Sequence, residues 1–198
     1  MKLIFASHNK GKIIEMHKIM APLAILSAEE VGVFTDVVED GTTFAENALK
    51  KAKWLVEKTG EWAFGDDSGL CIEALHGLPG VHSKRWSGEN KSDERLVDFT
   101  LDKMKEFTDR RAFFQTDVAL VAPDGREWFF SGQVKGVITA APRGLIRDHL
   151  PYDVIFQPNG YNQTFAEMSH EEKNFLSHRG LAFTQLKKFL MESKLFNI

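Results

Sequence analysis

The sequence has almost no cysteine, since Cys71 is the single one among 198 residues. One cysteine excludes an internal disulfide and the paired cysteines of a structural zinc site. A lone cysteine is more often a buried small hydrophobic residue than a nucleophile, which is the alternative role. The shortage of cysteine favours a reducing compartment, so we expect a cytoplasmic protein.

Long hydrophobic runs and an excess of positive charge are also lacking. No stretch approaches the ~18 apolar residues of a membrane span, and the apolar run in "MKLIFASHNK" is too short for a signal peptide. The net charge is −3, which disfavours a general nucleic-acid binder. We therefore expect no membrane and no nucleic acid as partners, and a bound anion would need a few placed cations.

The composition does allow a normal core, because 43% of the residues are hydrophobic and 27% are charged. The pattern predicts β-α-β-α-β, then a helix, an antiparallel pair of strands and more helix. This order is typical of an α/β fold with a mixed sheet flanked by helices. We expect one domain over residues 1–198, with two lobes around a cleft. The expected strands are 3–6, 24–26, 62–65, 111–122, 126–138 and 154–156, and the expected helices are 12–21, 42–60, 92–107 and two after Ser169.

Three local signals support these elements most strongly. Thr43 with Glu46, and Ser169 with Glu172, each form the capping-box pattern that satisfies the free amides of a helix start. The "PDG" at 123–125 predicts a tight turn between two strands. The last helix is expected to follow "SHRG", which ends at Gly180.

The first candidate for chemistry is "FASHNKGK" at 5–12, a polar turn between a strand and a helix. Free amides and the positive end of the helix dipole make such a turn an anion site. Lys12 lies in the first helical turn, where its ammonium can reach the same anion, and Ser7 and Asn9 can donate hydrogen bonds. The alternative is a polar turn with solvated lysines.

The second candidate is "GDDSG" at 65–69, two carboxylates at an expected strand end. Mg²⁺ prefers carboxylate oxygens and keeps several waters, which suits phosphate chemistry. Adjacent residues on a strand face opposite ways, so Asp66 and Asp67 should not share a face. An Asx-type turn without metal is the alternative.

Two further segments carry charge. Glu39 and Asp40 precede a helix start, where acidic residues also favour the helix dipole, and Lys51 on that helix suits either a cleft or a solvated face. Lys173, His178 and Arg179 lie close together in "SHEEKNFLSHRG", and ordinary surface charge is the alternative for them. Taken together, the four segments favour a nucleoside triphosphate with Mg²⁺.

These segments resemble the inosine triphosphate pyrophosphatases, the ITPase/RdgB-like nucleotide hydrolases. The resemblance covers nearly the whole chain in family order. It is carried by "SHNKGK" at 7–12, "EDGTTFAENALKKA" at 39–52, "DDSGLCIEALHGLPGVHSKRWSG" at 66–88 and "EEKNFLSHRGLA" at 171–182. It implies an elongated α/β fold and a Mg²⁺-dependent homodimer. It also implies cleavage of deaminated purine triphosphates such as ITP, dITP and XTP to a monophosphate and pyrophosphate, which sanitises the nucleotide pool.

The resemblance also implies residue roles. Glu39 and Asp67 would bind Mg²⁺, and Asp67 would activate the attacking water with support from Asp66. Within the phosphate turn Asn9 and Lys12 would act foremost, with His8 and Lys10 nearer the solvent. The remaining substrate-binding expectations are Ser7, Gly11, Lys51, Ser68, Tyr152, Asp153, Lys173, His178 and Arg179, the last two near the base.

One segment departs from the family, "APRGLIRDHLPYDVIF" at 141–156. The family pattern ends "FGYDPIF", and here its Phe-Gly pair is Leu150-Pro151 while Arg147, Asp148 and His149 replace expected glycines. That Phe is expected to stack on the purine, and Leu150 offers no π face. Two alternatives follow: a related pyrophosphatase with a shifted base preference for modified pyrimidine or methylated nucleotides, or a nucleotide-binding protein without turnover.

Overall fold

A six-stranded mixed sheet forms the centre of the molecule, with the strand order β2-β1-β3-β4-β5-β6. The computed structural model describes residues 2–88, 92–147, 149–193 and 195. β1 is parallel to β2 and β3, and the remaining neighbours are antiparallel. The strands are β1 Leu3–Phe5, β2 Ile25–Ser27, β3 Trp62–Ile72, β4 Arg111–Val121, β5 Glu127–Ile138 and β6 Phe156–Pro158. The α/β class with a mixed sheet is confirmed.

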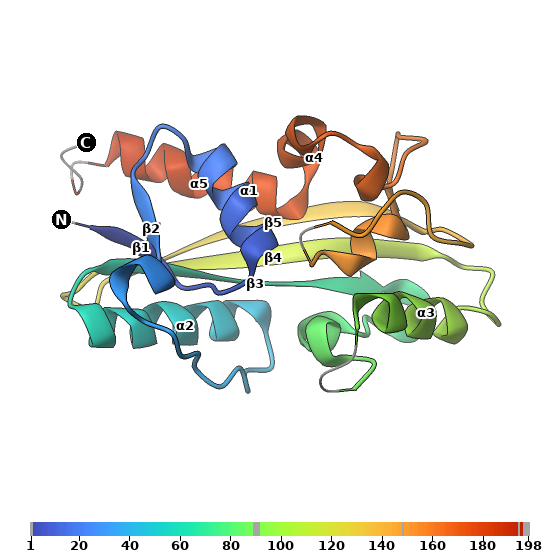
Figure 1. Ribbon diagram of the computed structural model, residues 1–198, viewed down its shortest axis with the longest axis horizontal. Helices are drawn as coiled ribbons and strands as arrows, with labels where there is room; N and C mark the ends of the chain where they lie inside the picture. The colour runs from blue at the N-terminus through green and yellow to red at the C-terminus, as the bar shows by residue number, and fades with distance from the viewer. Residues whose placement is uncertain (1, 89–91, 148, 194, 196–198) are drawn as a thin grey trace.

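Helices cover both faces of the sheet (Figure 1). α1, α4 and α5 lie on one face, and α2 and α3 lie on the other. The helices are α1 Lys10–Met20, α2 Phe44–Thr59, α3 Asp93–Lys103, α4 His170–Leu176 and α5 His178–Glu192, with short 3-10 helices at Glu29–Val31, Glu73–Leu75, Gly80–Arg85, Pro151–Val154 and Phe165–Glu167. Among the described residues, none of these helices combines the length and apolar character that crossing a membrane requires.

α2 begins and ends where local chemistry dictates. The Thr43 side chain accepts a hydrogen bond from the Glu46 amide, and the Glu46 carboxylate accepts from the Thr43 amide, so the predicted capping box is present. Gly60 closes the helix with a left-handed backbone, φ 68°. The second predicted box, Ser169 with Glu172, opens α4 in the same way.

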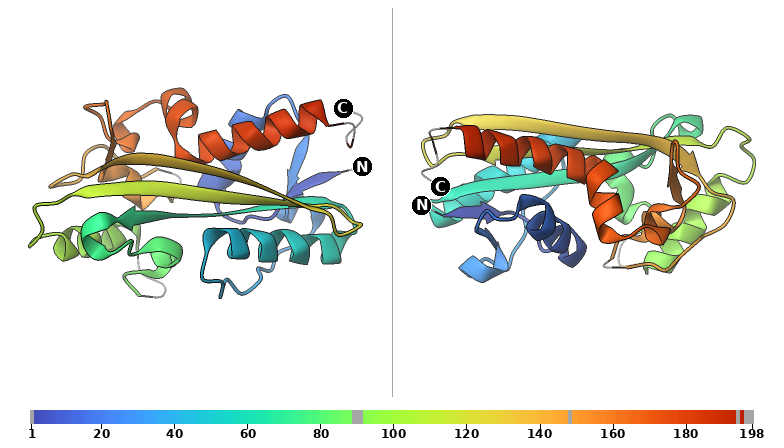
Figure 2. Two further views of the ribbon diagram at one scale, coloured as in Figure 1. Left: turned by 180° about the vertical axis from the view of Figure 1, so that it is seen from behind. Right: turned by 90° about the horizontal axis from the view of Figure 1, so that it is seen from above.

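The sheet runs along the long axis of the molecule (Figure 2). The two main core clusters lie at different ends of its long strands, one at Trp62 and Phe64 of β3 and the other at Leu70 and Ile72. At one end, Phe5 stacks on Phe64 at 4.8 Å between ring centroids, and Phe183 of α5 meets both rings edge-on. At the other end, Phe114 of β4 packs against Phe156 and other aromatic residues. The charged cluster described below lies between these two apolar regions.

The structure corrects the prediction of a strand at 62–65, because β3 continues to Ile72. β4 pairs antiparallel with β3 from Ala63 to Ile72, and this long partner overrides the weak strand preference of Gly and Asp. Asp66 and Asp67 therefore lie in the middle of a strand rather than at its end.

Other boundaries differ as well. The final helix begins at His178, before "SHRG" ends, because Ser177 caps it through the Gly180 amide. The strand predicted at 154–156 is wrong in its first part, since Pro151–Val154 form a 3-10 helix and β6 begins at Phe156. α1 begins two residues earlier than predicted, at Lys10.

The shortness of β1 has a direct effect on the centre of the sheet. β1 pairs only with Trp62–Phe64 of β3, and the chain leaves the sheet at Ala6. Among the described residues, no strand then lies beside residues 65–69 of β3 on that side. Both faces of this stretch of β3 can therefore contribute to one cavity.

Candidate active site

A cavity of about 470 Å³ lies at this open edge of β3. It is surrounded by the turn after β1, the segment before α2, the middle of α2, the 3-10 helix Gly80–Arg85 and the α4–α5 junction. Most of the predicted site residues line it: Ser7, His8, Asn9, Lys10, Lys12, Glu39, Lys51, Asp67, Ser68, Tyr152, Asp153, Lys173, His178 and Arg179. Gly11 and Asp66 are buried just behind its wall.

The turn from β1 into α1 is the strand-turn-helix arrangement that the sequence predicts. Asn9 is the N-cap of α1, and its side-chain oxygen accepts a hydrogen bond from the Lys12 amide at 3.1 Å. The Ser7 hydroxyl accepts from the Asn9 amide at 3.3 Å. The turn is therefore held in shape by the two side chains that were expected to contact an anion.

We expected both His8 and Lys10 to lie near the solvent. Lys10 is exposed, whereas His8 is half-buried. The His8 ring lies 2.8 Å from the Asp36 carboxylate and 3.0 Å from the Val33 carbonyl. Partial burial lowers the His8 pKa, but these two partners outweigh that effect and raise it. His8 thus braces the segment that leads toward Glu39.

Asp66 faces the α1 and α5 side of the sheet and is wholly buried. Its carboxylate lies 2.9 Å from the Lys12 ammonium and 3.4 Å from Nε of Arg179. Burial would raise the Asp66 pKa, yet the nearby positive charges hold it well below its usual range. Asp66 therefore compensates the buried cations, in agreement with a supporting role.

Asp67 faces the opposite side of β3, toward α2, so the prediction that the two aspartates do not share a face is confirmed. Its carboxylate accepts hydrogen bonds from the Asn47 side chain and the Ser68 amide, each at 2.9 Å. Burial raises the Asp67 pKa above its ordinary value. Asp67 lines the cavity, and Asp66 is not among the lining residues.

Lys51 joins the two carboxylate-bearing segments. Its ammonium donates to the Asp66 carbonyl at 2.7 Å and lies 3.2 Å from the Glu39 carboxylate. Burial opposes its charge, but Asp66 and Glu39 outweigh that effect and raise its pKa. Lys51 is therefore a buried cation of the cavity, and the solvated face considered for it is wrong.

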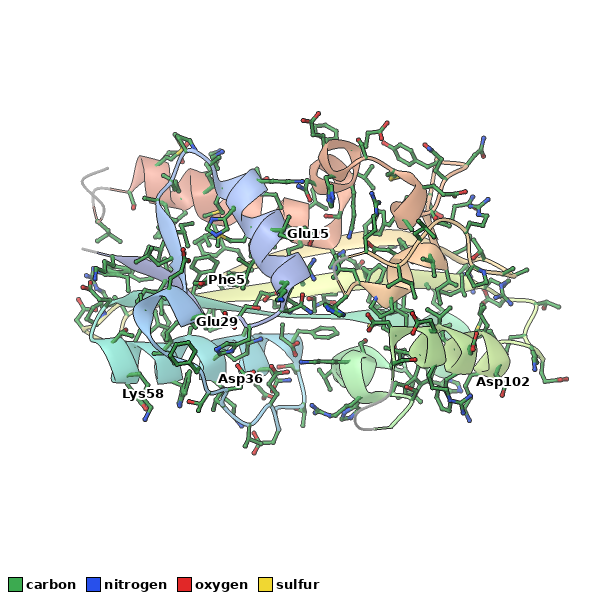
Figure 3. All side chains as sticks on the ribbon, viewed as in Figure 1. Phe5, Glu15, Glu29, Asp36, Lys58 and Asp102 are labelled. Atoms are coloured by element: carbon green, nitrogen blue, oxygen red, sulfur yellow. The ribbon has the colours of Figure 1, made fainter. Side chains whose placement is uncertain are left out.

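Glu15 of α1 is a member of the site that the sequence reasoning missed (Figure 3). Its carboxylate bridges Lys173, at 2.7 Å, and Arg179. Lys173 also pairs with Asp153. Glu15 follows Lys12 by three residues on the same helix, and that spacing is the one signal that could have placed it toward the cavity.

His178 and Tyr152 form an aromatic end of the cavity. The His178 ring stacks on Phe114 at 4.5 Å with 9° between the planes, and the Tyr152 hydroxyl donates to the Ser83 carbonyl. Burial and the Arg179 charge hold the His178 pKa well below its usual value, so its imidazole is neutral. Phe114 lies within a strand pattern, and no local feature of the sequence singles it out.

In the segment that departs from the family pattern, Arg147 stabilises the fold, whereas other residues line the cavity. Arg147 donates to the carbonyls of Ala166 and Met168 at 3.0 and 2.9 Å, so it holds the fold together. His149 lines the cavity and lies 3.1 Å from Asp93, and Leu150 and Pro151 line it beside Tyr152. Asp148 lies outside the described residues.

Comparison with known proteins shows which family the sequence matches. A model of the Ham1 family matches residues 3–189. A dITP/XTP pyrophosphatase of Streptomyces coelicolor is 43% identical over 96% of this chain and 98% of its own length. One from Geobacter sulfurreducens is also 43% identical, over 96% of both chains.

Solved structures give the same relationship. A HAM1 protein from Coxiella burnetii superposes with a TM-score of 0.88 and 35% identity, covering 98% of this chain and all, 100%, of that one. The Ham1 protein of Staphylococcus aureus gives a TM-score of 0.84 and 36% identity, covering 96% of this chain and 98% of that one.

Proposed function

The chain belongs to the Ham1 family, and on this premise we propose that it hydrolyses deaminated purine nucleoside triphosphates such as dITP and XTP to the monophosphate and pyrophosphate. The observation that carries the proposal is the cavity in which Lys12 and Lys51 lie beside Asp67. Relatives that align over nearly their full length bear the name dITP/XTP pyrophosphatase, which supports the substrate class.

The phosphate end of the site is the N-terminus of α1 with the two buried lysines. Amides at a helix start favour negative charge, and Lys12 and Lys51 each add a positive charge there. The neighbouring carboxylate of Asp66 keeps these cations in place before substrate arrives. Hydrolysis of a phosphoanhydride depends mainly on such positioning and charge neutralisation.

Glu39 and Asp67 fit a divalent cation, which we propose to be Mg²⁺. Both are carboxylates, the donor type that Mg²⁺ prefers. They come from different segments, both line the cavity, and the Glu39 charge helps to raise the Asp67 pKa, a repulsion that a cation would relieve. No cluster of three or more acidic, His or Cys ligands occurs among residues the structure describes, so water and phosphate would complete the shell. A bound Mg²⁺ would neutralise charge on the phosphate oxygens.

Asp67 is the proposed base. One of its oxygens accepts from Asn47 and the other from the Ser68 amide, so its carboxylate has a fixed orientation toward the cavity. Its raised pKa brings it closer to neutrality than a free aspartate, which suits removal of a proton from water.

The end of the cavity that holds the nucleobase of the substrate is proposed to lie at His178, Tyr152 and Leu150. A neutral His178 can donate one hydrogen bond and accept another, and Arg179 and Lys173 are oriented by Glu15 behind it. The wall formed by Leu150 and Pro151 is aliphatic, so a shifted base preference is the second candidate.

A substrate panel tests the proposal. We would incubate the protein with dITP, XTP and the four common triphosphates plus Mg²⁺ and identify the products. Release of pyrophosphate with a preference for dITP or XTP is expected. Orthophosphate release, or tight binding without hydrolysis, would contradict the proposed activity, and preference for a modified pyrimidine would support the second candidate.

We further propose that residues 1–198 act as one two-lobed domain, as a homodimer in the cytoplasm. The length of the family match supports a single unit, and the lone cysteine supports a reducing compartment. Light scattering on the purified protein measures the oligomeric state directly.

A further inference from the structure

The segment that carries Glu39 is held mainly by polar contacts. Residues 33–43 form neither helix nor strand, and its largest apolar side chains, Phe34 and Val38, are 75% and 74% exposed. Val33 alone in this segment packs against a core cluster, at its first residue. The position of the remaining residues must come from polar contacts made by neighbouring elements.

Asn47 of α2 makes one of these contacts from a fully buried position. Its side-chain oxygen accepts a hydrogen bond from the Gly41 amide at 2.8 Å. Gly41 approaches so closely that a Cβ there would lie 2.6 Å from the same oxygen. The segment is thus seated on the Asn47 side chain, and only glycine allows that approach.

The nitrogen of the same amide group contacts Asp67 of β3. The Asn47 nitrogen donates to Oδ2 of Asp67 at 2.9 Å. A single buried side chain therefore connects the Glu39 segment on one side with the Asp67 carboxylate on the other. Lys51 also pairs with Glu39, and its charge acts on Asp67, but its ammonium donates to the Asp66 carbonyl. Among the hydrogen bonds described, only Asn47 links the Glu39 segment to the Asp67 carboxylate through one side chain.

We propose that Asn47 is a positioning residue that sets Glu39 and Asp67 at the separation a divalent cation needs. The inference rests on the proposed function, because it assumes that these two carboxylates share a cation. Asn47 itself has both ends of its amide occupied, so it acts through its two neighbours. Residues that orient metal ligands in this way typically contribute about 10- to 100-fold to metal affinity or activity.

Three variants test the proposal. Asn47→Ala removes both hydrogen bonds, and Gly41→Ala crowds the Asn47 oxygen while it keeps the amide group that donates to Asp67. Val56→Ala is the control, because it trims the same helix at a partly buried position away from the site. We would measure Mg²⁺ binding to the nucleotide-free protein by calorimetry, the Mg²⁺ dependence of pyrophosphate release, and thermal unfolding.

Asn47→Ala should weaken Mg²⁺ binding by roughly 10- to 100-fold, and Gly41→Ala should weaken it by less. KM for dITP at saturating Mg²⁺ should stay near the wild-type value in both, since the lysines that bind phosphate are untouched. Val56→Ala should bind Mg²⁺ normally. This should hold even if it lowers the unfolding temperature as much as Asn47→Ala does.

The outcomes separate this inference from the proposed function. Wild-type Mg²⁺ affinity in Gly41→Ala and Asn47→Ala, with an active parent enzyme, overturns the positioning role and leaves the proposed function standing. If Asn47→Ala does not fold, Gly41→Ala alone decides the question. A parent protein that binds no divalent cation overturns both.

Discussion

At the residue scale, the two adjacent aspartates illustrate how one strand serves two purposes. Asp66 is directed into a buried cluster of cations, and Asp67 is directed into the cavity. Their pKa values move in opposite directions for that reason: cations hold that of Asp66 down, and burial raises that of Asp67. The alternation of a strand thus separates charge compensation by Asp66 from the proton removal that we propose for Asp67.

Asp67→Asn should retain nucleotide binding and lose turnover, because the amide cannot accept a proton from water. Loss of a general base typically lowers the rate by about 10²- to 10⁴-fold. Single-turnover kinetics and binding of a non-hydrolysable dITP analogue measure the two effects. Asp117→Asn is the matched control, since Asp117 lies opposite Asp67 on β4 and does not line the cavity. Near-normal turnover in Asp67→Asn would refute the role.

Glu15 should make the protein sensitive to acid. Burial would raise its pKa, but Lys173 and Arg179 hold it at about 2 against an ordinary 4.5. Because the folded value is depressed, the stability from ionised Glu15 is present above about pH 4.5 and is lost as the pH falls toward 2.

Glu15→Gln should therefore lower the free energy of unfolding at pH 7 by roughly 3 kcal/mol, since it removes the buried carboxylate that Lys173 and Arg179 share and leaves them only Asp153 and Asp66. The variant should also lose less stability than the parent when the pH is lowered. Urea unfolding at pH 7 and at low pH measures both. Glu171→Gln, at an exposed position of α4, should behave like the parent, and an equal pH dependence in all three proteins would contradict the prediction.

Leu150→Phe should improve binding of purine substrates if the wall beside Tyr152 contacts the base. Stacking of a base on an aromatic ring contributes roughly 1–3 kcal/mol, so KM for dITP should fall about fivefold or more. Steady-state kinetics measure the change. Leu145→Phe, at a position that is 77% exposed and outside the cavity, should have no effect. An unchanged KM in Leu150→Phe counts against base contact at this wall.

At the scale of elements, the contact between β5 and α5 fixes the end of the cavity that we propose for the nucleobase. A Cβ on Gly132 would lie 2.1 Å from the His178 carbonyl and 2.8 Å from the Ala182 amide. α5 can therefore start directly against β5 only because residue 132 is glycine. The placement of His178 and Arg179 depends on this close approach.

Gly132→Ala should push the start of α5 away from the sheet. Overpacking of this kind costs about 1–3 kcal/mol of unfolding free energy, which lowers the unfolding temperature by roughly 2–4 °C for each kcal/mol. The turnover number should fall as well, because His178 and Arg179 move together. Calorimetry and kinetics on this variant and on Gln133→Ala, the exposed neighbour, measure the effect. Normal stability and turnover in Gly132→Ala would show that the helix tolerates the shift.

Elements with strong local signals could be predicted from the sequence, and those that depend on distant partners could not. The capping boxes at Thr43 and Ser169 and the turn at "PDG" are local, and all three are present. The strand predicted at 62–65 is too short because "GDDSG" at 65–69 is a poor strand sequence taken alone. Only its pairing with β4 makes this stretch part of β3.

The site shows the same limit. Its predicted residues meet in one cavity, whereas Glu15 and Phe114 were missed because their partners are distant in the sequence. Arg179 follows Glu15 by 164 residues, and nothing near Glu15 indicates that partner. Phe114 meets His178 only because β4 and α5 pack together. Roles inside the cavity stay predictions, and the variants above test them.

At the scale of the whole molecule, ligand binding should stabilise the fold, because the cavity draws residues from both helical layers. Mg²⁺ with a non-hydrolysable triphosphate should raise the unfolding temperature, by the equivalent of about 2.7 kcal/mol when the ligand is at 100 times its dissociation constant. EDTA should reverse most of the shift, since the triphosphate alone lacks the cation that joins it to Glu39 and Asp67. Calorimetric scans with each addition measure this, and a shift that EDTA does not change would argue against a divalent cation.

The shortness of β1 also bears on the order in which the molecule can assemble. The β4–β5 hairpin closes across a few residues, whereas β1 must find β3 across the length of α1, β2 and α2. Local pairings form sooner than distant ones, so the hairpin can be in place before the turn at Ser7–Lys12 reaches the edge of β3. Asp66, which pairs with Lys12 of that turn, also pairs with Arg179, which emerges late in synthesis. A nascent chain would therefore complete the cavity that we propose for the triphosphate in the last steps of folding, and binding of nucleotide would report that the fold is complete.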